Sequence, residues 1–392
     1  MIDETFTKRR TLVLKRGKER VVSNRHPWIF AGAIHSEHGP EQAAFAELAD
    51  ESGSRIATGL YSLHSQIRMR ALTFGHEELT AELIESRLTA AIQRRKAVLD
   101  TTNTAARLVN SEGDDLSSLV IDRFGDVVVV EITNRGAEQL KPLIVSVLQR
   151  EVAPRLIYFK NDLPSREIER LSMTEESVGE GEPQTTIQES GLTFHVDPRG
   201  GQKTGFFLDQ RENRRLARGL AREGRVLNLF SYTGAFGVYA AAGGATAVTN
   251  VDVSTPALAL AAENHRLNGS EAENVVGDAF EFVRRQRATY DLVVCDPPAF
   301  AKSRSEIDRA ARGYKDVNLH ALKRVAPGGM MLTFSCSGHI SLDLFQKIIF
   351  AAALDAGRQV TFVRRLGAGP DHPVSLFCPE GEYLKGFLLE VR

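Results

Sequence analysis

The sequence has few of the residues that hold small secreted domains or metal sites together. It contains only three cysteines in 392 residues, Cys295, Cys336 and Cys378, and no C-x-x-C pair. A low, odd number without paired spacing argues against a disulfide framework or a zinc site. No apolar run reaches membrane-spanning length, and the opening residues, MIDETFTKRR, contain no apolar signal core. We therefore expect a cytoplasmic protein with no membrane segment and no bound metal.

A strong excess of charge of either sign is also missing. The formal net charge is −1, so the molecule as a whole is not an electrostatic binder of nucleic acid. The charges are nevertheless uneven, because basic residues dominate residues 1–35 and acidic residues dominate residues 36–80. A basic face on a neutral protein suggests a docking patch, although an ordinary solvated surface accounts for the charge count equally well.

The length and composition predict a soluble protein of two or three domains. Residues 1–76 are predicted to form a small β-rich domain, with short strands at 11–14, 20–23, 43–48, 56–61 and 67–71. Residues 77–190 are predicted to form an α/β connector with helices at 79–100 and 137–149, a hairpin of 116–123 with 127–133, and a strand at 156–160. Its last part, 174–190, is acidic and reads as a loop or linker. Residues 191–392 form the third predicted domain.

The stretch Val226–Ser254 reads as one βαβ unit. Val226–Phe230 is an apolar run typical of a buried parallel strand, and a tight turn ending in Gly234 follows it. A small apolar helix comes next, and a second buried strand ends on Asp252. A glycine turn after one strand and an acid at the tip of the next are typical of a nucleoside site, because the acid accepts hydrogen bonds from a ribose diol. An ordinary crossover without a ligand is the alternative.

The turn lacks the G-x-G-x-x-G fingerprint, which argues against a dinucleotide. Three later strand candidates also end on polar residues, namely Asp278, Asp296 and Cys336. Ligands of open α/β sheets bind at the carboxyl ends of the strands, so these residues are predicted to converge on one cleft. Before this βαβ unit, Asp209 is predicted to cap a helix that runs to Ala221.

These motifs together resemble the class I S-adenosylmethionine methyltransferases. The resemblance implies an α/β, Rossmann-like domain in which Gly234 passes under the methionine part of S-adenosylmethionine. It also implies that Asp252 holds the ribose and that Asp278 meets the adenine amine beside Phe280. The full set of cofactor-binding residues that we expect is Lys203, Gln210, Asn228, Phe230, Tyr232, Thr233, Gly234, Asp252, Ser254, Asp278, Ala279, Phe280 and Asp296.

The first 75 residues contain LKRGKERVVSNRHPWIFAGAI, which resembles the opening of a PUA domain, a compact RNA-binding β-barrel. We interpret Trp28, the only tryptophan, as a core residue rather than a platform for base stacking. The resemblance implies an RNA partner.

Cys336 indicates the type of reaction. Carbon 5 of a pyrimidine is a poor nucleophile, and a thiolate that adds at carbon 6 makes an enamine able to take a methyl group. Asp296-Pro297-Pro298 lies where methyltransferases place a target-base motif, and its prolines remove N–H donors while leaving carbonyl acceptors. We therefore predict that Cys336 is the nucleophile and that Asp296 holds the N3/N4 edge of the base. A small strand-end residue is the alternative interpretation of Cys336, and Cys295 reads as a buried core thiol.

The arrangement KTGFFLDQR, NLFSYTGAFG, DPPAF, SCSG and EGEYLKGFLLEV resembles the bacterial large-subunit rRNA cytosine-C5 methyltransferases over nearly the full chain. The resemblance implies 23S rRNA as partner and 5-methylcytidine as product. Many RNA cytosine-C5 methyltransferases have a second cysteine where this chain has Pro298. The substrate-binding residues that we expect are Pro297, Pro298, Phe300, Arg211 and Arg312, and Arg214 is also expected to hold an RNA phosphate. A homodimer is compatible with the surface strands, but the sequence does not locate its interface.

Two other functions stay open. A related branch of the same fold methylates guanine N7 and has asparagine at the position of Cys336, and this reaction needs no covalent step. A non-catalytic RNA-binding assembly factor is a second alternative, and it predicts that no cofactor binds.

Overall fold

The computed structural model describes residues 6–392, whose contacts divide the chain into two units. Unit 1 comprises Met1–Thr185, Val196–Phe206 and Asp371–Gly381, and unit 2 comprises Thr186–His195, Phe207–Pro370 and Glu382–Arg392. Residues 196–206 and 371–381, which the sequence assigns to the third domain, therefore group with unit 1. Residues 1–5, part of the stretch expected to lack a signal core, lie outside the described residues.

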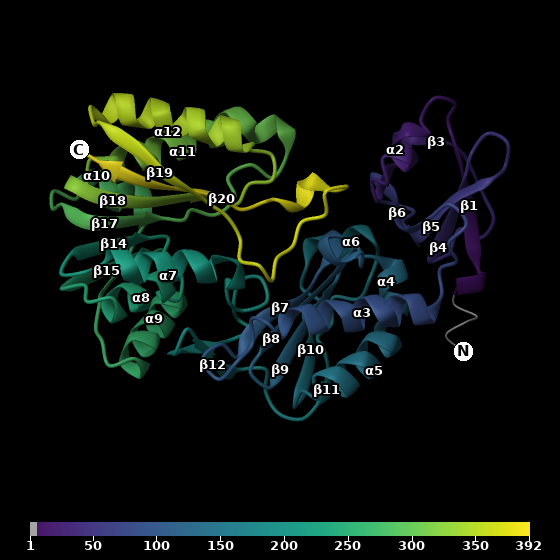
Figure 1. The fold of residues 1–392 in the computed structure, drawn as a ribbon, viewed down its shortest axis with the longest axis horizontal. Coiled ribbons are helices and arrows are strands. Elements are labelled where there is room, and N and C mark those ends of the chain that lie inside the picture. The colour runs from purple at the N-terminus through teal and green to yellow at the C-terminus, as the bar shows by residue number, and fades with distance from the viewer. Residues whose placement is uncertain (1–5) are drawn as a thin grey trace. The chain divides into compact units, whose positions relative to one another are not determined.

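The first sheet of unit 1 has six strands in the order β2-β6-β5-β4-β1-β3 (Figure 1). The strands are β1 (Arg9–Leu14), β2 (Trp28–Phe30), β3 (Ile34–His38), β4 (Phe45–Ala49), β5 (Arg55–Tyr61) and β6 (Ile67–Phe74). The predicted β-rich start is therefore present, although β2 and β3 were not predicted and one predicted strand is wrong. Arg20–Ser23 is a short helix, α2, and not a strand, because backbone N–H groups such as that of Ser23 bond back to Glu19.

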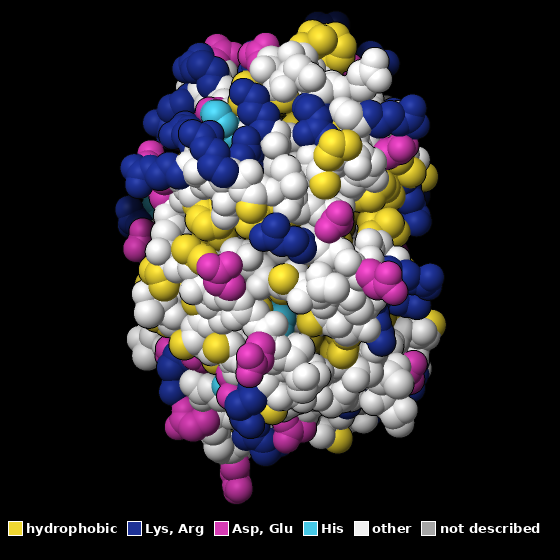
Figure 2. All heavy atoms as spheres, turned by 90° about the vertical axis from the view of Figure 1, so that its left-hand side faces the viewer, with side chains coloured by type: hydrophobic (Ala, Val, Ile, Leu, Met, Phe, Trp, Pro, Cys, Tyr) yellow, Lys and Arg dark blue, Asp and Glu magenta, His cyan; other side chains and the backbone are white. Residues whose placement is uncertain are grey.

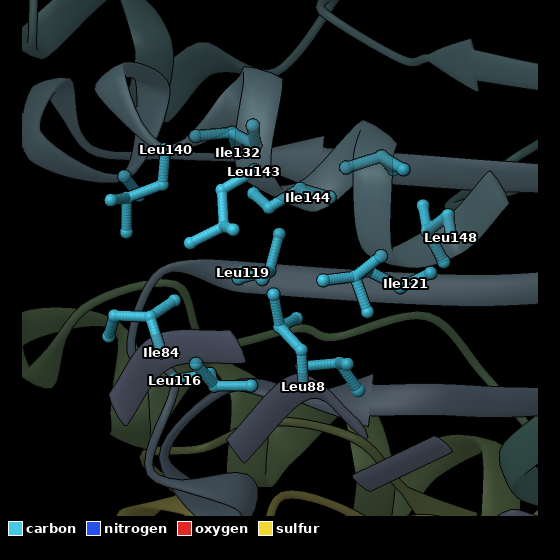
Figure 3. Close-up of a cluster of buried hydrophobic side chains, with 14 of the residues drawn as sticks. Ile84, Leu88, Leu116, Leu119, Ile121, Ile132, Leu140, Leu143, Ile144 and Leu148 are labelled. Atoms are coloured by element: carbon cyan, nitrogen blue, oxygen red, sulfur yellow. The ribbon is translucent and has the colours of Figure 1, made fainter. Parts of the chain in front are cut away.

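The second sheet of unit 1 has the order β11-β10-β9-β8-β7. Its strands are β7 (Ala105–Asn110), β8 (Leu119–Phe124), β9 (Val127–Ile132), β10 (Leu156–Phe159) and β11 (Glu176–Gly179), and its helices are α3 (Ala81–Arg95), α4 (Arg135–Gln139), α5 (Lys141–Glu151) and α6 (Pro164–Ile168). Figure 3 shows Ile84 and Leu88 of α3 and Leu143 and Ile144 of α5 packed with Leu119 of β8. This core explains the apolar spacing of both predicted helices.

The acidic stretch 174–190 is not wholly a loop. β11 lies within it and pairs antiparallel with β10, although all four of its residues are exposed. β12 (Thr185–Glu189) also begins there and forms a two-stranded hairpin with β13 (Leu192–Val196). An edge strand with polar, solvated side chains needs no apolar alternation, so the composition alone did not reveal it.

Unit 2 is built on a seven-stranded sheet of order β16-β15-β14-β17-β18-β20-β19 (Figure 1). Its strands are β14 (Arg225–Leu229), β15 (Ala247–Asp252), β16 (Glu273–Val276), β17 (Tyr290–Cys295), β18 (Val325–Ser335), β19 (Val360–Leu366) and β20 (Lys385–Val391). The pairs from β16 to β18 are parallel, and β20 is antiparallel to both its neighbours. This is the predicted Rossmann-like α/β sheet, and its strand order reverses beside β14.

Helices supply the covering layers of this sheet. They are α7 (Arg211–Leu220), α8 (Ala235–Ala242), α9 (Thr255–Leu267), α10 (Ala279–Arg285), α11 (Ile307–Leu322) and α12 (Leu342–Ala356). The strands β14 and β17 are buried on both faces, which accounts for their continuous apolar runs. Within residues 6–392, no helix is long and apolar enough to cross a membrane.

Candidate functional site

The turn between β14 and α8 has an unusual backbone. Phe230, Tyr232 and Gly234 adopt left-handed φ angles of 57°, 49° and 74°. Two non-glycine residues in this conformation within three positions store strain, and such strain concentrates at binding turns. Gly234 must be glycine, because an added Cβ would stand 2.7 Å from the Cβ of Ala261 on α9. The turn therefore packs closely against α9.

Two hydroxyl groups in this turn lack partners among the described residues. The Ser231 Oγ and Thr233 Oγ1 atoms are buried without a hydrogen bond, while the Thr233 carbonyl accepts from the Asn264 side chain. A buried hydroxyl without a partner costs about 1–3 kcal/mol, which a bound polar ligand would recover. The turn therefore has buried polar groups that a bound ligand would satisfy, and the cofactor contacts that the sequence predicts there stay predictions.

Asp252 at the end of β15 is held by the same turn. Its Oδ2 accepts the Tyr232 backbone N–H at 2.8 Å, and its Oδ1 accepts the Ser254 N–H at 2.9 Å. Ser254 in turn caps α9 by accepting the Ala257 N–H at 3.2 Å. A carboxylate oxygen can accept more than one hydrogen bond, so Asp252 is oriented and still able to accept from a ribose diol.

The end of β16 reaches the same place through an aromatic contact. Asp278 is exposed and caps α10, since its Oδ1 accepts the Glu281 N–H at 3.0 Å. Ala279 is buried at the first helical position, and the next residue, Phe280, places its ring 5.9 Å from that of Phe230 in an edge-to-face arrangement. The structure therefore brings the predicted ribose and adenine residues to one edge of the sheet. S-adenosylmethionine fits this donor and acceptor set.

Asn228 has a structural role that the sequence did not reveal. Its side chain donates to Asn250 on β15 at 2.9 Å, and Asn250 donates to Asn274 on β16 at 3.0 Å. These three residues face one another in the parallel register and form an asparagine ladder across three strands. Asn228 is 1% exposed, and its contact with a cofactor stays a prediction.

The loop after β17 carries the predicted target-base motif. Asp296 accepts a hydrogen bond at its Oδ2 from the Gln210 side chain at 2.9 Å, and Gln210 is held by Asn213. Pro297 is buried and Pro298 is exposed. Phe300 packs against the helix side of this loop, with its ring 5.7 Å from Phe280 and 4.5 Å from Tyr314. Phe300 therefore contacts Phe280, one of the predicted cofactor residues, from within this loop.

Cys336 follows β18 and lies beside this loop. Its thiol donates to the Pro297 carbonyl, with 3.7 Å between Sγ and O. Cys336 is partly exposed, whereas Cys295 is fully buried within β17. Burial and the charge of Asp296 raise the pKa of the Cys295 thiol. Cys295 is thus a core thiol, as predicted, and Cys336 is the accessible one of the pair.

Three residues around Cys336 were missed by sequence reasoning, namely Tyr314, Ser337 and Lys385. The Ser337 hydroxyl accepts the Ala301 N–H at 3.2 Å and bonds the Tyr314 hydroxyl at 2.9 Å. The Ser337 carbonyl accepts from Lys385 Nζ at 2.9 Å. Burial raises the pKa of Tyr314 and lowers that of Lys385. A lysine at the start of a mostly apolar strand is the sequence signal that points to this group.

The predicted arginine contacts differ in exposure. Arg312 on α11 is exposed and available to an RNA phosphate, whereas the Arg211 side chain is 2% exposed. Arg214, also interpreted as a phosphate contact, is instead a structural residue. Its guanidinium makes two hydrogen bonds of 2.7 Å to the carboxylate of Glu189, and both groups are buried.

Two more predicted residues precede α7. Lys203 is an exposed residue that groups with unit 1 and has a φ of 50°, and its contact with the cofactor stays a prediction. Asp209 does not cap α7, since the helix starts after Gln210 without a side-chain cap. Asp209 instead accepts a hydrogen bond of 2.6 Å from the Tyr383 hydroxyl. The hydrogen bond from Tyr383, a residue far away in the sequence, thus takes the place of the predicted capping bond.

One cluster in unit 1 has the composition of a metal site. Ligand atoms of His26, Cys378 and Glu380 lie within 4.8 Å of one another, and His26 Nε2 is 3.2 Å from Glu380. His26 Nδ1, however, accepts the Trp28 backbone N–H at 3.0 Å. This bond places the proton of the neutral ring on Nε2, where a metal would need a lone pair. The arrangement therefore fits a hydrogen-bonded cluster and not a metal centre.

Basic side chains gather on part of unit 2 as well as in the N-terminal segment. Figure 2 shows Lys and Arg side chains grouped over the upper part of the face that lies at the left of Figure 1. Exposed basic residues of α10 and the loop after it are Arg284, Arg285 and Arg287. Nucleic-acid phosphates are bound by such groups of positive charge.

Comparisons with known proteins agree with this geometry. Residues 113–380 match the family model of the S-adenosylmethionine-dependent methyltransferases, and residues 12–74 match that of a PUA-like domain. A protein named ribosomal RNA large subunit methyltransferase I from Klebsiella pneumoniae is 41% identical over 402 residues, which cover 100% of both chains. A protein of the same name from Photobacterium profundum is 42% identical over 395 residues, or 97% of this chain and 99% of the relative.

A solved structure, SMU.776 complexed with SAH, superposes with a TM-score of 0.83 at 24% identity. The match covers 97% of this chain and 99% of that chain. At this identity the likeness shows the fold, including its N-terminal part, and nothing about substrate.

Proposed function

Since the chain belongs to the S-adenosylmethionine-dependent methyltransferase family, we propose that it methylates carbon 5 of a cytosine in 23S rRNA. The name of its relatives supports an rRNA of the large ribosomal subunit as substrate. The observation that carries the choice of carbon 5 is the position of Cys336, whose Sγ lies 3.7 Å from the carbonyl of Pro297 in the target-base loop. A nucleophilic thiol is needed for an atom that cannot attack a methyl group unaided.

Each group of the site has a role in this reaction. S-adenosylmethionine supplies an electrophilic methyl group when it is bound over the turn of Gly234. Cys336, as thiolate, forms a bond from Sγ to carbon 6 of the cytosine, and the displaced π electrons make carbon 5 nucleophilic. After methylation and loss of the carbon-5 proton, the bond from carbon 6 to Sγ breaks, and its electron pair returns to sulfur.

Asp296 is the group that orients the base. Its Oδ2 accepts from Gln210, and this hydrogen bond fixes the plane of the carboxyl group. A protonated Asp296 donates to N3, and an ionised one accepts from the N4 amino group. Pro297 and Pro298 supply carbonyl acceptors without competing N–H donors. The buried Cys295 is one residue before this loop and is not accessible as a second thiol.

The RNA must present an unstacked cytosine. Carbon 5 of a paired base lies at the edge of a deep, narrow groove that side chains do not enter, so a single-stranded or flipped nucleotide is expected. Arg312 and the basic residues of both units are the proposed phosphate contacts, and the PUA-like domain of residues 12–74 is the proposed second RNA-binding surface.

The decisive experiment is methyl transfer to rRNA from cells that lack the modification, followed by mass spectrometry of the product nucleoside. We expect 5-methylcytidine from the wild type and no product from Cys336→Ala. Cys378→Ala is the matched control, because it removes the buried thiol of unit 1 and should leave the product unchanged. RNA containing 5-fluorocytidine should form a covalent adduct with the wild type and none with Cys336→Ala.

The alternatives give different outcomes. A guanine methyltransferase of the same fold would keep its activity in Cys336→Ala and would yield a methylguanosine. A non-catalytic assembly factor would bind RNA without any transfer, and its site would have no use for the buried polar groups of Ser231 and Thr233.

A further inference from the structure

Lys385 occupies an unusual position next to Cys336. It is the first residue of β20, which pairs antiparallel with β18 so that Lys385 faces Ser335. From there its side chain reaches past the end of β18, and Nζ donates to the carbonyl of Ser337 at 2.9 Å. Cys336 lies between these two serines in the chain. Lys385 is thus paired with the residue before Cys336 and bonded to the backbone of the residue after it.

The ammonium of Lys385 is buried without a carboxylate. Lys385 is 5% exposed, and in the described residues 6–392 its Nζ bonds to the Ser337 carbonyl and forms no ion pair within 4.0 Å of an acid. Burying an unpaired ammonium is costly, and proteins normally compensate for it with an anion. Burial lowers the pKa of Lys385, whereas the negative charge of Cys336 acts in the opposite direction. A thiolate at Cys336 is therefore the anion in this site that can compensate the positive charge of the Lys385 ammonium.

We propose that Lys385 is the positioning residue that activates Cys336, by stabilising the thiolate with its positive charge. Lys385 is already an ammonium, so the thiol proton leaves to solvent, and the resulting thiolate and the ammonium balance each other's charge. The inference rests on the proposed role of Cys336 as nucleophile. It supplies what an ordinary cysteine lacks, because a thiol with a pKa of about 8.5 is only a few per cent ionised at neutral pH.

Other titratable groups also lie near Cys336, and their charges either disfavour its thiolate or have no effect on it. Asp296 lies next to Pro297 in the loop after β17, and its negative charge disfavours a thiolate. Tyr314 from α11 is a neutral hydroxyl near neutral pH, since burial raises its pKa. Glu382 precedes β20, is exposed, and is screened by solvent. Lys385 supplies a positive charge that interacts with this sulfur.

The test measures the rate of alkylation of Cys336 by iodoacetamide against pH, without RNA or S-adenosylmethionine. Alkylated peptides are identified by mass spectrometry, so that the buried Cys295 and Cys378 are counted separately. We expect the wild-type midpoint to lie clearly below 8.5, and Lys385→Met to move it upward by about one pH unit, or tenfold in rate at pH 7. Lys385→Arg should keep a low midpoint. Glu382→Gln is the matched control, because it removes an exposed charge of the same segment and should leave the midpoint in place.

Each possible result either supports or refutes the proposed role of Lys385. A wild-type midpoint at or above 8.5 refutes the proposal even if Lys385→Met does not fold. A folded Lys385→Met with an unchanged midpoint shows that Lys385 only anchors the Ser337 carbonyl. Failure of this inference is separate from failure of the proposed function, because alkylation does not depend on the base that is methylated. A low midpoint in an enzyme that makes methylguanosine would leave Lys385 as activator and remove the cytosine assignment.

Discussion

Replacing Gly234 with alanine tests the cofactor turn directly. Gly234 has a φ of 74°, and its Cβ would stand 2.7 Å from the Cβ and 3.3 Å from the Cα of Ala261. The backbone of α9 must therefore shift, or the turn must move away from it. Either change displaces Thr233 and the Tyr232 N–H, which are linked to Asn264 and Asp252.

The expected magnitude has two parts. A left-handed alanine costs about 1–2 kcal/mol, and this part weakens folding wherever the residue lies. The contact with Ala261 adds a cost that the turn relieves by moving, and this part weakens binding of S-adenosylmethionine. A loss of about 2 kcal/mol in binding corresponds to roughly a thirtyfold higher Kd.

Isothermal titration calorimetry with S-adenosylmethionine measures the second part, and urea unfolding measures the first. Gly244→Ala is the matched control, because Gly244 has a φ of 94° and nothing within 4 Å of the added Cβ. We expect Gly244→Ala to lose stability and keep its affinity for S-adenosylmethionine, whereas Gly234→Ala loses both. Equal affinities in the two variants would show that the turn does not contact the cofactor.

Three further predictions concern other parts of the chain. Gln210→Leu removes the donor to Asp296 and should slow single-turnover methyl transfer about tenfold, and it should also lower thermal stability because Asn213 loses an acceptor. Burial raises the pKa of Glu131 to about 7 from 4.5, so its contribution to stability is present at low pH and lost as pH rises through 7. Glu131→Gln should flatten urea-unfolding stability between about pH 4.5 and 7, and an unchanged slope would contradict this assignment. Gly219→Ala, in α7 with open space around it, should raise the melting temperature by removing about 0.5 kcal/mol of helix penalty.

The sequence predicted the sheet of unit 2 and the meeting of its strand ends. Apolar runs bounded by turn residues located β14, β15 and β17, because strands buried on both faces contain little else. Polar residues after these strands then converge by topology alone, which placed Asp252 and Asp296 at one edge. These inferences succeed because the sheet's register and direction follow from local patterns.

The residues that were missed or misjudged depend on partners far away in the chain. Arg214 pairs with Glu189, and Asp209 accepts from Tyr383, so neither has the role that its neighbours in sequence suggest. Lys385 acts on Ser337 across 48 positions. A single side chain has many possible partners over such distances, and only the folded backbone selects one. The error at α2 has a different reason, since four residues carry too little periodicity to separate a helix from a strand.

The asparagine ladder has a consequence for how the site assembles. If β15 slipped by one residue against β14, Asn250 would turn to the opposite face of the sheet, and the amides of Asn228 and Asn274 would lose their partners. Each amide that loses its hydrogen-bond partner costs about 1–3 kcal/mol in the interior, so misaligned sheets are strongly disfavoured. Asp252 lies two positions after Asn250 and turns with it. A chain that aligns these three amides during folding has thereby also oriented Asp252, the acid proposed to bind the ribose, before any ligand binds.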